Sequence, residues 1–457
     1  MSAPEIDKLL GIEAYATKTS GVGGAIREAV DDFVVEEILV DGSKANINGI
    51  LPSKVLASTA HKQRFLLCVL VKRNWDTFVA VKNVAKTLGV EQGRVQFAGI
   101  KDAKAVTAQF ITLENVAIED AKKISVKDVA VYPIGYLREQ LALFYLLGNH
   151  FTITIKHLKE PKEIIEKQVA QTIHELDAVS GIPNFFGHQR FGTTRPITHL
   201  VGKALAQGDF EGATMLFLAK PSVHEHPASR QARQELAESG NFKQAVENFP
   251  KQLRFERLML SHLAENPSDF VGAFKRLPVK LLALFVQAHQ SYLFNRFLSE
   301  RINHKLPLNE ATVGDFVVGV ERSGLPLTSM VKVATAENLN EINAQVKAGR
   351  LRVALPVFGV KQKLSEGAMG ALEKEVLSQE GVEPDKLRFN TVSRVGGKGG
   401  LRVVSAPIRD FKLQSVSEGT NGEGCQAKLS FMLLRGCYAT VLLRELMKPS
   451  DLIAAGF

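Results

Sequence analysis

One stretch of this sequence orders the rest around it, Phe97-Ala-Gly-Ile-Lys-Asp-Ala-Lys-Ala-Val-Thr-Ala-Gln-Phe110. The residues that lead into it, from Arg94 to Phe97, have the pattern of a strand. Gly99 follows, where the chain can turn tightly because glycine has no Cβ. A turn after a strand is a common place for a functional side chain. We therefore expect a strand, a turn and a functional group in direct succession here.

The turn carries one carboxylate, Asp102, between the ammonium groups of Lys101 and Lys104. The sequence has no other acidic residue between Glu91 and Glu114. Nearby positive charge favours the ionised form of a carboxyl group. The residues alone leave two interpretations open: a solvated turn with a local Lys–Asp pair, or a turn that presents a reactive carboxylate.

Length and composition limit the protein class. A chain of 457 residues can form two or three domains, and 45% apolar with 23% charged residues is typical of a globular protein. The formal net charge of +9 predicts a polyanionic partner, because Lys and Arg neutralise phosphates. The cysteines, Cys68, Cys425 and Cys437, include no C-x-x-C pair, so we expect neither a disulfide framework nor a cysteine-built zinc site.

The sequence also indicates where the protein acts. Its beginning lacks the pattern of a signal peptide, and no apolar run approaches the roughly 20 residues that span a bilayer. We therefore expect a cytoplasmic protein without membrane contact.

Hydrophobic periodicity predicts the elements around the turn. We expect Asn74 to cap a helix that Gly89 ends, and a long amphipathic helix over residues 161–179. From about 193 to 390 the pattern favours long, charged helices with few strands. Strands are expected at 32–38, 64–72, 94–97, 110–113, 147–156, 401–405 and 427–433, and further helices at 287–302 and 436–446.

Two other segments mix residue types in a way that suits a binding site. In the strand pattern of residues 32–38, Glu37 shares a face with Phe33, which fits either a pocket rim or an edge strand protected by charge. The segment Asn184-Phe-Phe-Gly-His-Gln-Arg-Phe-Gly192 combines aromatics, an amide, an arginine and glycines. This mixture is typical of a loop that stacks on a flat ring and bonds its edge, or of aromatics that fill a domain junction.

Together, these segments resemble the TruD family of tRNA pseudouridine synthases. The turn matches the signature G-x-K-D-x-x-A-x-T-x-Q from Gly99 to Gln109, and the aromatic loop matches N-x-F-G-x-Q-R-F-G from Asn184 to Gly192. The resemblance spans residues 24 to 446. Shorter matches are D-F-x-V-x-E at 32–37, G-N-x-F at 148–151, Q-S-x-L-F-N at 290–295, and G-S-Y-A-T-x-x-L-R-E at 436–445, where Cys437 replaces the serine.

The resemblance implies an α+β fold, in which a pseudouridine-synthase mixed, mainly antiparallel sheet is flanked by helices and interrupted by an inserted, mainly helical TRUD-type domain. It places the catalytic domain in residues 1–192 plus 393–457 and the insertion in residues 193–392. It implies that Asp102 is the catalytic residue. The residues expected to lie near the substrate or to bind it are Lys101, Phe33, Glu37, Asn184 and Phe186.

Each of these residues has an expected role. Lys101 would keep Asp102 ionised and pair with a phosphate, Phe186 would stack on the uracil, and Asn184 would orient the loop or the edge of the base. His188 falls on a variable position of the family pattern, so we do not expect it to be catalytic. Asp102 could stabilise positive charge at C1′, deprotonate C2′ or attack covalently, and the sequence does not choose among these.

By resemblance the substrate is tRNA, with uridine 13 the leading position, and no protein partner is implied. The isomerisation needs no redox step and no group from a cofactor, and the sequence has neither a dinucleotide loop nor a metal cluster. We therefore expect no cofactor and no metal. Two other classes stay open: a non-catalytic RNA-binding or RNA-chaperone protein of the same fold, and an aspartate-dependent nucleoside hydrolase or glycosylase, which would release free base.

Overall fold

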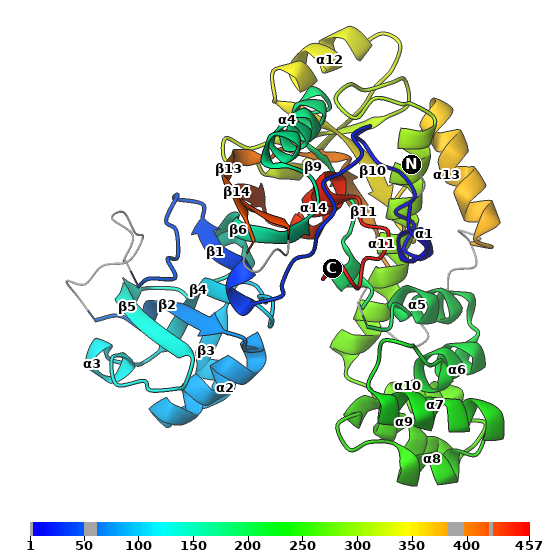
Figure 1. Ribbon diagram of the computed structural model, residues 1–457. Coiled ribbons are helices and arrows are strands. Elements are labelled where there is room, and N and C mark those ends of the chain that lie inside the picture. The colour runs from blue at the N-terminus through cyan, green and yellow to red at the C-terminus, as the bar shows by residue number, and fades with distance from the viewer. Residues whose placement is uncertain (1–2, 50–61, 193, 383–396, 420–423) are drawn as a thin grey trace. The chain divides into compact units, whose positions relative to one another are not determined.

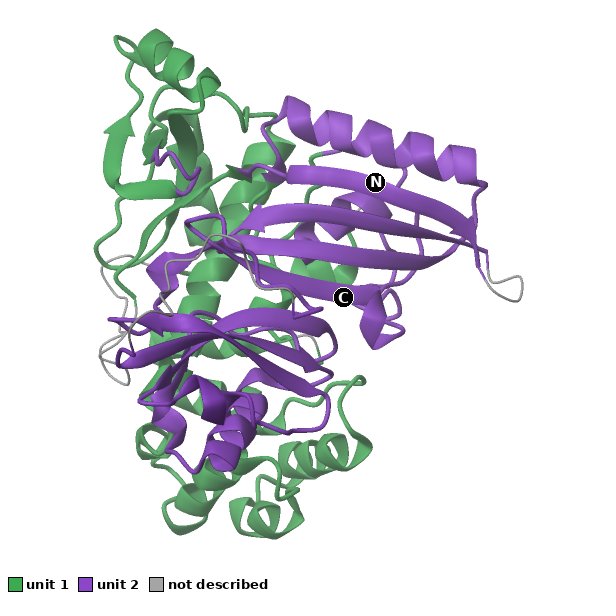
Figure 2. Cartoon of the chain, turned by 90° about the vertical axis from the view of Figure 1, so that its left-hand side faces the viewer, with its two compact units in different colours: residues 1–16, 183–319, 326–405 green, residues 17–182, 320–325, 406–457 purple. Residues whose placement is uncertain are grey.

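The computed structural model describes residues 3–49, 62–192, 194–382, 397–419 and 424–457. The chain forms two compact units, each assembled from three segments that are far apart in the sequence (Figure 2). Unit 1 comprises Met1–Ala16, Pro183–Gly319 and Pro326–Ser405. Unit 2 comprises Thr17–Ile182, Val320–Leu325 and Ala406–Phe457.

Unit 2 is built on an eight-stranded sheet. Its strands are β1 (Phe33–Leu39), β2 (Phe65–Arg73), β3 (Val95–Phe97), β4 (Val106–Glu114), β5 (Val129–Leu137), β6 (Leu146–Leu158), β13 (Arg409–Glu418) and β14 (Cys425–Leu434). They follow the order β13-β14-β6-β1-β4-β2-β5, and β3 pairs with β4. β1 runs parallel to β4, whereas the other pairs are antiparallel. β2 and β4 are central strands, which explains why their sequences are almost continuously apolar.

The helices of unit 2 are α2 (Thr77–Leu88), α3 (Ile118–Ala121), α4 (Lys162–Ala178) and α14 (Ala439–Met447). Figure 1 shows α2 next to the sheet, and its apolar side chains cluster with Leu66, Cys68 and Leu70 of β2. Gly89 ends this helix in the left-handed conformation, as predicted. The prediction that Asn74 caps it is wrong: the Asp76 carboxylate accepts the free backbone N–H groups of the first turn.

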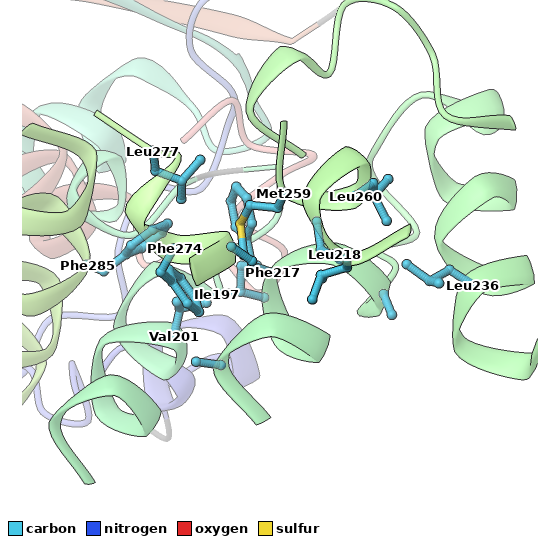
Figure 3. Packing of buried hydrophobic residues seen from close by; sticks show 14 of the residues in the cluster. Ile197, Val201, Phe217, Leu218, Leu236, Met259, Leu260, Phe274, Leu277 and Phe285 are labelled. Atoms are coloured by element: carbon cyan, nitrogen blue, oxygen red, sulfur yellow. The ribbon is translucent and has the colours of Figure 1, made fainter. Parts of the chain in front are cut away.

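Unit 1 contains most of the helices and a smaller sheet. Its helices are α1 (Glu5–Leu9), α5 (Thr198–Gln207), α6 (Phe210–Ala219), α7 (Pro227–Ser239), α8 (Phe242–Asn248), α9 (Arg254–Glu265), α10 (Phe270–Lys275), α11 (Val279–Asn303), α12 (Leu339–Lys347) and α13 (Gly367–Gln379). A hydrophobic cluster holds α5 to α11 together, with Phe285 of α11 in edge-to-face contact with Phe217 and Phe274 (Figure 3).

The smaller sheet of unit 1 has the order β11-β10-β8-β9. Its strands are β8 (Phe316–Val320), β9 (Pro326–Val333), β10 (Leu351–Val357) and β11 (Gly400–Val403). The two-residue strands β7 (Ile182–Pro183) and β12 (Ser405–Ala406) lie where the chain passes from one unit to the other.

The structure confirms the predicted α+β class, with a mixed, mainly antiparallel sheet flanked by helices. The sequence analysis does not predict β5, β8, β9, β10 and β13. For β9 and β13 the reason is that most of their side chains are exposed, so no buried face imposes a regular alternation. The division into a catalytic domain and an insertion of residues 193–392 stays a prediction. Its expected boundary at residue 393 lies outside the described residues.

Candidate active site

The predicted turn lies between β3 and β4 of unit 2 and presents the Asp102 carboxylate. The Asp102 side chain is 37% exposed, and its Oδ1 lies 3.5 Å from a terminal nitrogen of Arg27. The start of the turn is fixed to β4, because the Gln109 amide donates a hydrogen bond of 3.1 Å to the Gly99 carbonyl. The signature glutamine therefore holds the turn that carries the signature aspartate.

Arg27 is the cation that faces Asp102. Its side chain is only 10% exposed, and its guanidinium carbon lies 4.0 Å from the centre of the Phe33 ring. Burial lowers the pKa of the Arg27 guanidinium, and the Asp102 carboxylate opposes that shift. Arg27 adopts a left-handed backbone conformation with φ of 60°. An arginine stacked on an aromatic ring and aimed at a half-exposed carboxylate is a preorganised ion pair.

Lys101 lies elsewhere than expected. Its ammonium is 2.7 Å from Oε1 of Glu37 and 2.7 Å from the amide oxygen of Asn149. The side chains of Lys101 and Glu37 are 5% and 0% exposed, so this is a buried ion pair. The other Glu37 oxygen accepts the backbone N–H of Phe110 at 2.8 Å. In the structure, therefore, the Lys101 ammonium ties the turn to β1 and β6, and Arg27, not Lys101, lies beside the Asp102 carboxylate.

Phe33 lies beneath Arg27. It is 1% exposed and makes an edge-to-face contact with Phe151, at 6.3 Å between ring centres. Phe33 and Glu37 are thus close to the Asp102 turn, but protein atoms cover both. β1 lies between β6 and β4, so the edge-strand interpretation is wrong. A direct contact of either residue with substrate stays a prediction.

Asn184 and Phe186 belong to unit 1. Asn184 is 3% exposed, and its amide group donates to the Val403 carbonyl at 3.0 Å. Its side-chain oxygen accepts a hydrogen bond of 2.7 Å from Arg402, and Arg402 also donates to the Asn184 backbone carbonyl at 2.9 Å. The amide is therefore used within the unit to fix the loop. This favours the expectation that Asn184 orients the loop over the alternative that it orients the edge of the base.

The Phe186 ring is half-buried and has arginine against it. The Arg402 guanidinium carbon lies 4.1 Å from the ring centre. The Phe186 backbone is fixed by Asn295 of α11, whose amide accepts from the Phe186 N–H at 2.8 Å and donates to its carbonyl at 3.0 Å. His188 is buried, and its Nε2 lies 2.7 Å from a carboxylate oxygen of Asp7. Its exclusion from the catalytic residues stays a prediction.

Sequence reasoning missed Arg27, Asn149 and Arg402 as neighbours of the predicted residues. A signal existed for two of them. Arg27 lies five positions before the first residue of the D-F-x-V-x-E segment, and Asn149 belongs to the G-N-x-F segment. Arg402 is more than two hundred positions from Asn184, and only folding brings them together.

Within the described ranges, no group of three or more His, Cys, Asp or Glu side chains could hold a metal ion. Among the helices that the structure describes, none is long and apolar enough to cross a membrane.

The fold has a close counterpart among solved structures. A crystal structure of a Methanosarcina mazei protein, described as "Putative tRNA pseudouridine synthase D (TruD)", matches with a TM-score of 0.82 and 36% identity, over 98% of this chain and 99% of the other. The fold is therefore that of the pseudouridine synthases. The chain belongs to the TruD family, whose model, described as tRNA pseudouridine synthase D (TruD), matches residues 9–446.

Two further relatives agree with this assignment. A protein of Methanosarcina barkeri named "Probable tRNA pseudouridine synthase D" is 38% identical over 99% of both chains. A protein of the same name from Pyrococcus abyssi is 36% identical over 95% of this chain and 98% of its own. The similarity thus covers both units and not the signature segments alone.

Proposed function

We propose that the protein is a tRNA pseudouridine synthase in which Asp102 is the catalytic residue. One observation carries the proposal: in a chain of the TruD family, the signature aspartate is present and half-exposed, and a buried arginine lies against it. A carboxylate that served only as part of a solvated turn would need no buried guanidinium beside it, because burying a charge has a high desolvation cost.

The reaction is an isomerisation. The bond between N1 of the uracil and C1′ of the ribose breaks, the base turns, and C5 bonds to C1′. C5 then loses its proton, and N1 gains one. A carboxylate next to C1′ can stabilise positive charge there, take a proton from C2′ or form a covalent bond to the sugar. Arg27 would orient the Asp102 carboxylate for any of these.

The substrate is proposed to be tRNA, and uridine 13 the position modified. A base within a folded RNA must leave its stack to reach a carboxylate in a protein. Phe186 is proposed to stack on the uracil, because its ring offers a flat apolar surface. The Arg402 guanidinium packs on this ring and fixes its position. Asn184 is proposed to hold this loop in place through Arg402 and Val403. The reaction is expected in the cytoplasm.

The test is tritium release from C5-labelled uridine in unmodified tRNA transcripts, with wild type and Asp102→Asn compared. The substitution keeps the size of the side chain and removes its charge. We expect release by the wild type alone, and mapping of the product to position 13.

Other outcomes would change the proposal in defined ways. Release by both proteins would keep the synthase and remove Asp102 from its centre. Free uracil as a product would indicate a hydrolase. Tight tRNA binding without release from any transcript would indicate a non-catalytic RNA-binding protein.

A further inference from the structure

Lys72 occupies an unusual place in β2. The preceding residues on its side of the strand, Leu66, Cys68 and Leu70, belong to the apolar cluster under α2. Lys72 continues this side at the end of the strand and is 0% exposed. A lysine at such a position commonly extends its ammonium to water, but here the whole side chain is covered.

The Lys72 ammonium is bound to backbone carbonyls. It donates one hydrogen bond of 2.7 Å to the carbonyl of Trp75 and another of 2.7 Å to the carbonyl of Asp102 itself. Trp75 lies in the loop between β2 and α2. Lys72 therefore joins the backbone of Asp102 to the loop that leads into α2.

The first residue of α2 makes a second connection to the same turn. The Thr77 hydroxyl accepts the backbone N–H of Lys101 at 3.1 Å and donates to the backbone carbonyl of Lys101 at 3.2 Å. Thr77 is also 0% exposed. The backbones of two successive residues, Lys101 and Asp102, are thus held by side chains from β2 and α2.

This arrangement is not the most favourable one for folding alone. An ammonium in a protein interior has a high desolvation cost, and an apolar residue of similar size at the same place would avoid it. Sites that depart from local stability rules in this way are expected to serve function. The bond to the Asp102 carbonyl indicates which function that is.

We propose that Lys72 is a positioning residue for catalysis: its ammonium holds the Asp102 backbone so that the carboxylate stays aimed at the reacting ribose. This rests on the proposed function. Lys72 itself touches no substrate in this scheme. It acts through the turn, together with Thr77.

The charged surroundings of Lys72 make its hydrogen bonds to the turn depend on pH. Burial lowers the pKa of Lys72 to about 8, the carboxylates of Asp102 and Asp76 oppose this shift, and the ammonium of Lys101 adds to it. Arg27 faces the same Asp102 carboxylate. Since the folded-state pKa is depressed, Lys72 is charged below about pH 8 and becomes neutral above it. Its bonds to the two carbonyls then lose their charge assistance.

The test compares Lys72→Met with wild type and with the control Lys82→Met, which makes the same change at an exposed position of α2. Three quantities are measured: tRNA affinity, the single-turnover rate from pH 6.5 to 9, and hydrogen exchange of the peptide covering residues 99–105. We expect Lys72→Met to bind tRNA as wild type does and to turn over about 10²-fold more slowly, since a small misplacement of a reacting group can have that effect. Exchange in the peptide should be faster, and the rate should no longer decline through about pH 8 as in wild type.

The opposite results would overturn the proposal. A Lys72→Met protein with the wild-type rate and exchange would do so, and so would a slow variant that kept the alkaline decline. If Lys72→Met does not fold, Thr77→Val replaces it, because this variant releases the same turn through the Lys101 peptide and should also give fast exchange and slow turnover. Wild-type activity on tRNA separates the two proposals: its absence would remove the proposed function, whereas its presence with unaffected variants would remove this inference alone.

Discussion

Arg27 and Asp102 form the residue contact on which the proposed chemistry depends. The guanidinium has the Phe33 ring beneath it and the Asp102 carboxylate 3.5 Å away. The stem of an arginine in such a position packs as an apolar group while its head fixes the orientation of the carboxylate. The guanidinium approaches the carboxylate from a defined direction, and a lysine at position 27 would not reproduce the stacking on Phe33.

Arg27→Met should therefore retain most of the packing over Phe33 and lose the charge beside Asp102. We expect the single-turnover rate on tRNA to fall on the order of 10²-fold, as when one preorganised charged group is removed from an active site. Arg73→Met is the matched control, because Arg73 forms an exposed pair with Asp31, and exposed pairs contribute little. Equal rates for Arg27→Met and wild type would contradict the assigned role.

Lys101 has a different role at the same scale. Its ion pair with Glu37 is buried, and removal of one member leaves a charge without its partner. Lys101→Ala should lower the free energy of unfolding by about 3 kcal/mol and reduce turnover through the displaced turn. Lys104→Ala, at an exposed position of the same turn, should leave unfolding by denaturant unchanged. A stable Lys101→Ala protein with weakened RNA binding would instead favour a direct phosphate contact.

At the scale of elements, β6 explains the short G-N-x-F segment. A Cβ on Gly148 would lie 2.2 Å from the Leu433 carbonyl of the neighbouring β14, so only glycine allows the strands to approach. Asn149 then bonds the Lys101 ammonium, and the Phe151 ring stacks on Phe431 with 5.3 Å between centres. Gly148 and Phe151 therefore serve the packing of β6 against β14, and Asn149 links β6 to the turn.

Gly148→Ala should force β6 and β14 apart. We expect a loss of about 1–3 kcal/mol in the free energy of unfolding, as for other overpacked sites, and a slower turnover because Asn149 moves with the strand. Gly93→Ala is the control, since a Cβ there meets no atom within 4 Å. Denaturant titration of both variants checks the prediction, and similar stability of the two would show that β14 can yield at this position.

At the scale of the whole molecule, the formal net charge of +9 bears on the proposed tRNA substrate. Binding of RNA through Lys and Arg releases counterions, so affinity falls steeply with salt. We expect the affinity of Asp102→Asn for tRNA to drop at least about tenfold between about 50 and 200 mM salt. Filter binding measures this without turnover, and an affinity independent of salt would mean that charge contributes little to recognition.

Much of the fold was predictable because it depends on local pattern. The continuous apolar run of β2 and the alternation of β1 and β6 mark buried strands, and the regular spacing of α4 marks an amphipathic helix. β9 and β13 were not predictable in this way, since their side chains are largely exposed. The N-cap of α2 was placed two residues early, because Asn74 and Asp76 are both good capping residues and only the backbone geometry decides between them.

By itself, the sequence determined the two most specific segments of the family resemblance: the signature that carries Asp102, and the loop from Asn184 to Gly192. These are continuous segments, and their chemistry can be recognised without knowing their neighbours. The tertiary structure alone decided the partners. It placed Arg27 beside Asp102, turned Lys101 toward Glu37 and brought the Lys72 ammonium to the Asp102 carbonyl. Adjacent residues in a tight turn can point in opposite directions, and strands distant in sequence become neighbours only when the sheet forms.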